Sequence, residues 1–215
     1  MRLTKYTHSC IRLDDGDRAL VIDPGVFSET QLALDGAHAV LITHEHADHL
    51  DSPALVAAAG ADPSLRVWAP AAVAETLAAE LGDRVTAVGA GASFEAAGFT
   101  VRTFGGLHAL IHPLIAAPVA NVGYLVEGAL YHPGDSFMVP PVPVETLLIP
   151  IHAPWSKISE VIDFAASVRA PRAFQIHDAL LNDAGSGLVD RLVGTVAATY
   201  GTTYTRLAAT QSVDL

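Results

Sequence analysis

The sequence predicts an α/β fold, a four-layer αββα sandwich in which two mixed sheets pack face to face and helices cover both outer faces. Two observations support this prediction. Short apolar runs rich in β-branched residues alternate with segments of helical periodicity. A β-rich stretch followed by a helix-bearing stretch also occurs twice along the chain. No Ser/Gly linker or low-complexity tract divides the 215 residues, so we expect a single domain over residues 1–215.

The first half begins with β-like runs that predict an antiparallel meander at 2–7, 10–13 and 19–22, with turn residues at 14–17 between the last two. A short apolar run then predicts a buried strand at 39–42. Ser52 and Pro53 are a cap and a first-turn proline for a helix at 54–59. The rest of this half is expected to form a strand at 66–69, a helix at 71–81 ended by Gly82, and a strand at 84–88.

The second half repeats the pattern. Strands are predicted at 93–97, 99–104, 122–127, 129–132 and 146–149. Apolar residues at helical spacing predict a helix at 156–168, and a strand at 172–176 follows it. An amphipathic helix at 188–200 and an edge strand at 202–207 complete the expected fold.

Composition limits the function. With 12 Lys and Arg against 23 Asp and Glu, the formal charge of −11 would repel a nucleic-acid backbone, so we expect a small-molecule substrate. The single cysteine, Cys10, excludes an internal disulfide, and together with an N-terminus that lacks a signal-like apolar stretch it predicts a cytoplasmic protein. No Asp, Glu, Lys or Arg occurs between Arg102 and Glu127. Prolines and histidines interrupt that segment, however, and argue against a membrane span.

The run Thr43-His44-Glu45-His46-Ala47-Asp48-His49 places imidazoles and carboxylates directly after a predicted buried strand. Residues two apart in a loop can face the same side, so His44 and His46 could share one metal ion. Asp48 and His49 could then turn toward a neighbouring ion. A solvated acidic loop would not need so many histidines.

Further polar residues follow other predicted strands: His108, Asp135, His152 and His177. Strand ends at one rim of a sheet converge, and two divalent ions 3.5 to 4 Å apart need about this many ligands and a bridging carboxylate. His112, four residues after His108, is an alternative ligand at that position. We interpret His152 as part of a pocket wall with Trp155 and Lys157.

Together the HxHxDH run, the later histidines and the Gly134-Asp135 pair resemble the metallo-β-lactamase superfamily, as does Ile22-Asp23-Pro24-Gly25. The resemblance implies an αββα sandwich with a metal centre at one edge. It further implies that His44, His46 and His108 hold a first metal, that Asp48, His49 and His177 hold a second, and that Asp135 bridges both.

The short chain and the opening Thr7-His8-Ser9-Cys10 resemble small bacterial hydrolases related to L-ascorbate-6-phosphate lactonase. This resemblance implies a small ester, lactone or phosphoester substrate. Two zinc ions are the expected cofactors, with iron or manganese as alternatives, because di-iron members typically carry Glu in place of the second histidine. A water shared by two zinc ions would have a pKa near neutrality, and Asp48 would be catalytic by orienting the resulting hydroxide and accepting its proton.

Two other functions remain open: an iron-dependent oxygenase or redox protein on the same fold, and a metal-binding protein without turnover. Around the expected centre, Asp23 is predicted to accept a hydrogen bond from a ligand, and His8 and His132 either support ligands or are structural. The loops at 24–30, 109–120 and 136–143 are mostly apolar. They predict either a hydrophobic substrate or an interface in a homo-oligomer.

Overall fold

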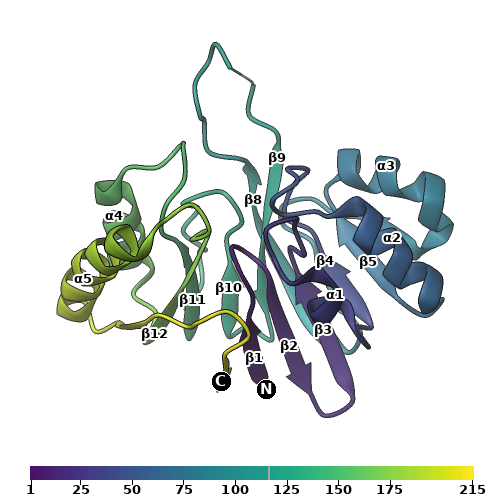
Figure 1. Cartoon of the computed structure of the whole chain (residues 1–215), viewed down its shortest axis with the longest axis horizontal. Coiled ribbons are helices and arrows are strands. Elements are labelled where there is room, and N and C mark those ends of the chain that lie inside the picture. Colours follow the sequence, from purple (N-terminus) through teal and green to yellow (C-terminus); the bar gives the residue numbers. More distant parts are fainter. Residues whose placement is uncertain (116) are drawn as a thin grey trace.

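Two seven-stranded sheets form the centre of the computed structural model, which describes residues 1–115 and 117–215. In the first sheet the strand order is β14-β1-β2-β3-β4-β5-β6, and in the second it is β13-β12-β11-β10-β9-β8-β7. Figure 1 shows the sheets side by side, with α1, α2 and α3 beside the first and α4 and α5 beside the second. The predicted αββα sandwich is therefore confirmed.

The strands of the first sheet are β1 (Arg2–Lys5), β2 (Ile11–Asp15), β3 (Arg18–Ile22), β4 (Ala39–Leu41), β5 (Arg66–Ala69), β6 (Val85–Ala87) and β14 (Ser212–Asp214). Those of the second are β7 (Ser93–Ala96), β8 (Phe99–Leu107), β9 (Ala120–Val126), β10 (Leu130–His132), β11 (Thr146–Pro150), β12 (Arg172–Ile176) and β13 (Thr203–Thr205). The helices are α1 (Thr30–Leu34), α2 (Ser52–Ala61), α3 (Ala71–Leu81), the 3₁₀ turn η1 (Gly82–Arg84), α4 (Ile158–Val168) and α5 (Asp183–Thr199).

Each sheet changes from antiparallel to parallel pairing halfway along. In the first sheet β14, β1, β2 and β3 are antiparallel neighbours, and β3 to β6 are parallel. In the second, β7 to β10 are antiparallel and β10 to β13 are parallel. Both sheets are mixed, as predicted. Hairpins connect successive antiparallel strands, and crossovers connect the parallel ones; each crossover contains a helix except the one between β10 and β11.

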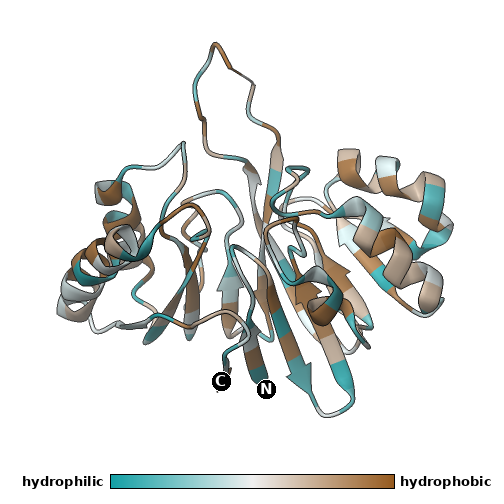
Figure 2. Ribbon diagram, viewed as in Figure 1, coloured by the Kyte–Doolittle hydropathy of each residue, from teal (hydrophilic) through white to brown (hydrophobic). Residues whose placement is uncertain are grey.

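Three apolar clusters separate the four layers. The first lies between the sheets and includes Leu20, Phe99 and Tyr124. The second packs the first sheet on its helices, and the third packs the second sheet on α4 and α5. In Figure 2 brown residues accordingly follow the strands and the inner helix faces. The burial of these side chains is the main force that holds the layers together.

Many element bounds shift by one to three residues, and the differences in three elements are larger. Helix α5 begins at Asp183, not 188, because the Asn182 side chain accepts the Gly185 N–H and caps a glycine-containing first turn. Helix α1 and strand β14 were not predicted. Both are too short for a periodic signal, and β14 is defined by its pairing with β1 at the far end of the chain. In the predicted pocket loop 109–120, residue 116 lies outside the described residues.

The two sheets are joined directly below the loop that follows β4. The Tyr124 hydroxyl, on β9, donates to the carbonyl of Ile42 at 2.8 Å, and the backbone N–H of Val122 donates to the carbonyl of Thr43 at 2.9 Å. These bonds fix the end of β4 against the second sheet. Among the described helices, none is both long enough and apolar enough to cross a membrane.

We predict that Tyr124→Phe lowers the free energy of unfolding by about 1–3 kcal/mol, because it leaves a buried carbonyl without its donor. Urea unfolding followed by circular dichroism measures this. Tyr131→Phe is the matched control, since the Tyr131 hydroxyl is buried without a hydrogen-bond partner in the described part of the chain. Equal losses in the two variants would show that the bond to Ile42 does not stabilise the sandwich.

Candidate metal centre

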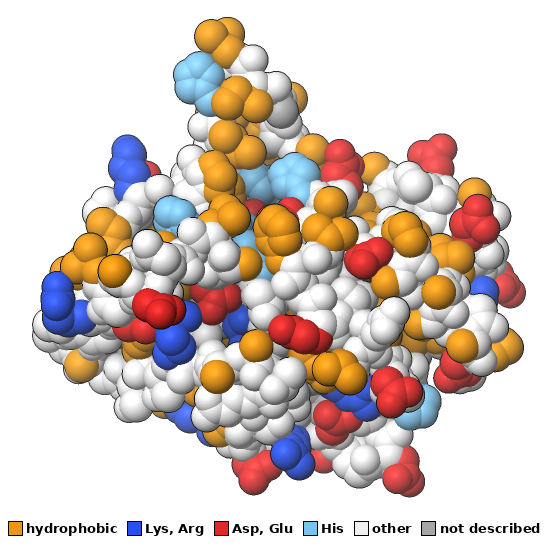
Figure 3. Space-filling view, in the orientation of Figure 1, with side chains coloured by type: hydrophobic (Ala, Val, Ile, Leu, Met, Phe, Trp, Pro, Cys, Tyr) orange, Lys and Arg blue, Asp and Glu red, His pale blue; other side chains and the backbone are white. Residues whose placement is uncertain are grey.

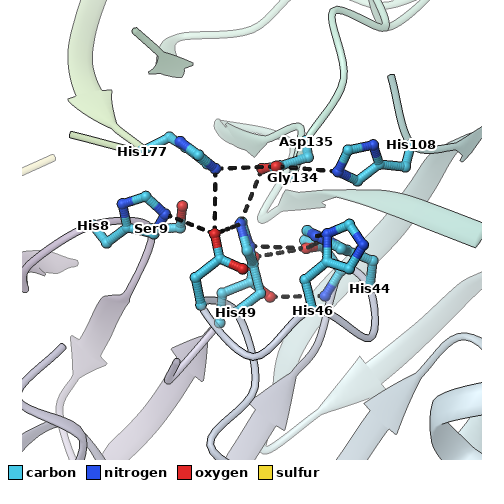
Figure 4. A network of polar contacts seen from close by, with 12 residues as sticks. His8, Ser9, His44, His46, His49, His108, Gly134, Asp135 and His177 are labelled. Atoms are coloured by element: carbon cyan, nitrogen blue, oxygen red, sulfur yellow. Dashed lines mark hydrogen bonds and ion pairs between the residues drawn. The ribbon is translucent and has the colours of Figure 1, made fainter. Parts of the chain in front are cut away.

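The histidine-rich run forms a loop after β4, at the edge of the sandwich (Figure 4). Its position depends on Asp23, a completely buried residue directly after β3. The carboxylate of Asp23 accepts the backbone N–H and the hydroxyl of Thr43, both at 2.7 Å. It also lies 2.7 Å from Nδ1 of His49. With Nδ1 engaged by Asp23, Nε2 of His49 is left to face the neighbouring ligand candidates.

Two glycines are required for the close approach of these loops. A Cβ at Gly25 would lie 1.8 Å from the carbonyl oxygen of Asp48. A Cβ at Gly134, whose φ is +63°, would lie 2.3 Å from Oδ1 of Asn121. That same amide oxygen accepts the backbone N–H of Asp135 at 3.0 Å. Glycine therefore lets each carboxylate-bearing loop pack onto its neighbour.

Four of the predicted ligands form a first group: His44, His46, His108 and Asp135. Each offers a ligand atom within 4.8 Å of the others. Nε2 of His44 lies 3.1 Å from Nδ1 of His46. The ring centroid of His108 lies 4.9 Å from that of His44 and 4.7 Å from that of His46. His44 and His46 come from the loop after β4, whereas His108 directly follows β8. The two sheets thus contribute to the same group.

A second group lies beside the first and consists of His8, Asp48, His49 and His177. Oδ2 of Asp48 is 3.6 Å from Nε2 of His177 and 3.9 Å from Nε2 of His49. His177 follows β12 and has a φ of +58°, and its Nδ1 donates to the carbonyl of His152 at 2.7 Å. That bond directs Nε2 of His177 toward the group.

Asp135 lies between the two groups. Its Oδ2 is 3.2 Å from Nε2 of His108 and 3.0 Å from Nε2 of His177, and its Oδ1 is 3.0 Å from Nε2 of His49. Figure 4 shows this carboxylate between the rings of His108 and His177. A carboxylate in this position can contact two metal ions at once.

The donor atoms of these groups fit metal ions. Buried ligand atoms of four side chains have no hydrogen-bond partner of acceptable geometry within the described residues: Nε2 of His49, Nε2 of His108, Nε2 of His177 and Oδ1 of Asp135. Buried polar groups are normally hydrogen-bonded, so a cluster of exceptions requires another partner. Imidazole nitrogens and carboxylate oxygens are the ligands that zinc and iron accept.

Both carboxylates are ionised at neutral pH. Burial raises the pKa of Asp48, but the hydrogen bond from His8 and the nearby His49 outweigh burial and lower the pKa to about 2. Burial likewise raises the pKa of Asp135, and the surrounding imidazoles of His49 and His177 outweigh it and hold this pKa well below its usual range. Two negative charges are therefore available to balance metal ions.

The imidazoles differ in protonation. Burial lowers the pKa of His44 well below its usual value and also lowers the pKa of His46, so both rings are neutral and able to ligate. Burial also lowers the pKa of His49, but the carboxylates of Asp135 and Asp23 outweigh it and raise this pKa well above its usual value. A metal ion that binds Nε2 of His49 must therefore displace a proton.

Two residues are closer to the centre than the sequence indicated. The Ala179 N–H donates to Nδ1 of His8 at 3.3 Å, so the neutral ring carries its proton on Nε2. This Nε2–H donates to Oδ2 of Asp48 at 3.1 Å. The indole N–H of Trp155 donates to Oδ2 of Asp135 at 2.9 Å. The sequence signals were Thr7-His8-Ser9 after β1 and Trp155 after β11, but neither specified a partner.

The remaining candidates lie outside both groups. His112 is exposed in the β8–β9 loop, so of the two alternatives the geometry selects His108. His152 contributes its backbone carbonyl, and His132 contacts the carbonyl of Ser9 at 2.9 Å. Lys157 is exposed and pairs with Glu160. Cys10 is buried, and burial raises the pKa of its thiol.

Residues 2–177 match the family described as Beta-lactamase superfamily domain. The chain is 38% identical over 193 residues to Protein Rv0786c of Mycobacterium tuberculosis, covering 87% of this chain and 89% of that protein. It is also 36% identical over 110 residues to a UPF0173 metal-dependent hydrolase of Xanthobacter autotrophicus, covering 47% of this chain and 45% of that protein.

Solved structures share the fold at low sequence identity. Igni18, described as a metallo hydrolase from Ignicoccus hospitalis, superimposes with a TM-score of 0.73 at 17% identity, over 99% of this chain and 97% of that one. CmlA, a diiron β-hydroxylase from Streptomyces venezuelae, gives 0.74 at 16% identity, over 100% of this chain and 54% of that one. The sequence match and the sandwich together show that the chain belongs to the β-lactamase superfamily and has the metallo-β-lactamase fold.

Proposed function

We propose that this protein is a dinuclear zinc hydrolase that cleaves a small ester, lactone or phosphoester. The observation that carries the proposal is the pair of adjoining His/Asp groups with Asp135 between them and several buried ligand atoms without hydrogen bonds. The similarity to a UPF0173 metal-dependent hydrolase supports it. The acidic composition favours a small molecule over nucleic acid as the partner, and the single cysteine favours the cytoplasm.

In this proposal His44, His46 and His108 hold one zinc ion, and Asp48, His49 and His177 hold the other. Asp135, which lies between the two sets of ligands, would contribute to both sites. When bound, the two ions supply Lewis acidity that lowers the pKa of a water molecule toward neutrality and polarises the bond to be cleaved.

Asp48 is the residue we assign to proton transfer. Its side chain is 25% exposed, whereas those of His8, His177 and Asp135 are at most 3% exposed, so Asp48 can reach a water molecule. Oδ2 accepts the hydrogen bond from His8, which leaves Oδ1 to orient the water and to accept its proton during attack. His8 acts through Asp48 and is therefore a positioning residue.

We predict about two zinc ions per chain in protein purified without a chelator or a histidine tag, measured by mass spectrometry. A chelator should abolish hydrolysis of lactone and ester probes, and added zinc should restore it. Predominantly iron, with oxygen consumption, would contradict the zinc proposal and favour an oxygenase. A chain that binds no metal when zinc is offered would contradict both.

His49→Ala and Asp135→Ala should each remove the second zinc ion and lower kcat/KM by at least about a hundredfold, because each deletes a donor that no neighbour can replace. Zinc content and turnover are measured on the same samples, with circular dichroism to verify the fold. Asp163→Asn, an exposed carboxylate change on α4, is the control. Turnover at the wild-type rate in either ligand variant would refute the ligand assignment.

His8→Ala should weaken binding of the second zinc ion and lower kcat by about 10–100-fold, because Asp48 loses the donor that orients it. His8→Gln, whose amide nitrogen can replace Nε2, should recover part of both. Competition with a zinc-binding dye measures the affinity. If the Gln variant behaved as the Ala variant does, packing of the ring and not its hydrogen bond would be the important property.

A further inference from the structure

Exposed apolar side chains gather around the metal centre. Six of them form what we call the apolar rim, and between 37% and 54% of each is exposed: Val26, Phe27, Leu110, Ile111, Met138 and Leu180. They belong to four loops, which follow β3, β8, β10 and β12. In Figure 3 hydrophobic side chains border the histidines near the base of the projecting β8–β9 loop. Apolar patches next to a polar site are typical of ligand-binding surfaces.

Direct contacts tie these loops to the proposed ligands. The ring of Phe27 lies edge-on to His8, with 5.3 Å between centroids, and the N–H of Val26 donates to the carbonyl of Ala47 at 2.9 Å. The N–H of Ala109 donates to the carbonyl of Asp135 at 2.8 Å. The loop that carries Leu180 is held by the bond from Ala179 to His8. The rim is therefore continuous with the metal centre.

A small hollow opens between the ligands and the rim. Two of its walls are the imidazoles of His46 and His108. The others are aliphatic side chains of the β8–β9 loop, among them Ile111, Pro118 and Val119. A molecule that reaches the metal ligands from this side must place part of its surface against hydrocarbon.

Acidic residues outnumber basic ones in this chain, and one exposed carboxylate lies among the proposed ligands. Glu45 is exposed between His44 and His46. The β8–β9 loop belongs to the segment between Arg102 and Glu127 that has no ionised Asp, Glu, Lys or Arg, and the whole chain has a formal charge of −11. Such a field disfavours the approach of an anionic phosphoester.

We propose that the substrate is an uncharged ester or lactone with an apolar group, and that this group lies against Ile111 and the apolar rim while the carbonyl faces the His/Asp groups. This inference rests on the proposed hydrolase function and selects one of its substrate classes. In the reaction the oxygen of water bonds to the carbonyl carbon and the bond from that carbon to the leaving oxygen breaks. One proton passes to the leaving oxygen and one is released, giving a carboxylate and an alcohol, or a hydroxy acid from a lactone. No oxidant is needed.

Binding of alkanohydroxamates to the zinc-loaded protein tests the apolar subsite without turnover. The hydroxamate chelates zinc, and the alkyl chain extends away from it. Burial of each methylene contributes about three- to fourfold in affinity when complete, so we expect the six-carbon compound to bind at least about tenfold more tightly than acetohydroxamate by calorimetry. Ile111→Ser should remove most of this difference. Leu188→Ser, which changes an exposed leucine on α5, should leave it unchanged.

Equal dissociation constants for the two hydroxamates would overturn the inference, as would tighter binding of phenyl phosphate than of the six-carbon compound. A dimer seen by light scattering that Ile111→Ser dissociates, with no chain-length dependence, would also overturn it by assigning the rim to a second copy of the chain. Turnover of 4-nitrophenyl acetate and hexanoate against bis(4-nitrophenyl) phosphate tests the hydrolase function separately. If chain-length dependence persisted without turnover of any probe, the subsite would stand and the hydrolase proposal would fail.

Discussion

The buried carboxylate of Asp23 is the interaction on which the metal centre depends. A charged group without solvent access is costly unless its oxygens are hydrogen-bonded, and Asp23 meets this requirement through Thr43 and His49. Because these partners are the first residue of the histidine-rich loop and its last imidazole, one carboxylate fixes both ends of the loop. The hydrogen bond between Asp23 and Nδ1 of His49 also determines which nitrogen of this ring faces the metal centre, because it leaves Nε2 free to point there.

The sandwich supplies the second constraint. The first sheet changes from antiparallel to parallel pairing at β3, the neighbour of β4, and the second sheet changes at β10. The ends of β4, β8, β10 and β12 therefore reach the same edge from different sheets. The hydroxyl of Tyr124 and the N–H of Val122 connect the sheets immediately below the histidine-rich loop, so the two halves of the ligand set cannot move independently. Such rigidity matters because metal ligation requires donor positions within a few tenths of an ångström.

Much of this could be predicted from sequence, for physical reasons that differ between residues. Strands such as Ala39–Leu41 and Arg172–Ile176 are apolar runs bounded by turn residues, and the residues after them were expected at a common edge. The partner of Trp155 could not be predicted, because its bond to Asp135 joins two loops whose approach depends on the packing of β10 against β11. The hydrogen bond from His8 to Asp48 could not be predicted either. It requires a left-handed backbone conformation at His8, and no local sequence pattern signals that conformation for a histidine. Sequence thus indicated which residues gather, whereas the hydrogen bonds that orient them follow from tertiary packing.

The composition of the ligand set also limits how well the metal centre itself can discriminate between substrates. Only two of the seven proposed ligands are carboxylates, and the five imidazoles that complete the set must be neutral to ligate, so a pair of divalent ions would keep an excess of positive charge. That excess attracts any electron-rich group, including carbonyl and phosphoryl oxygens, and so does not by itself distinguish esters from phosphoesters. Discrimination must therefore come from the surroundings of the ligands. There the chain places aliphatic side chains and the acidic Glu45, which favour a neutral molecule with a hydrocarbon part over an anion. The loops around the centre, and not the metal ligands, are the part of this protein that determines its substrate.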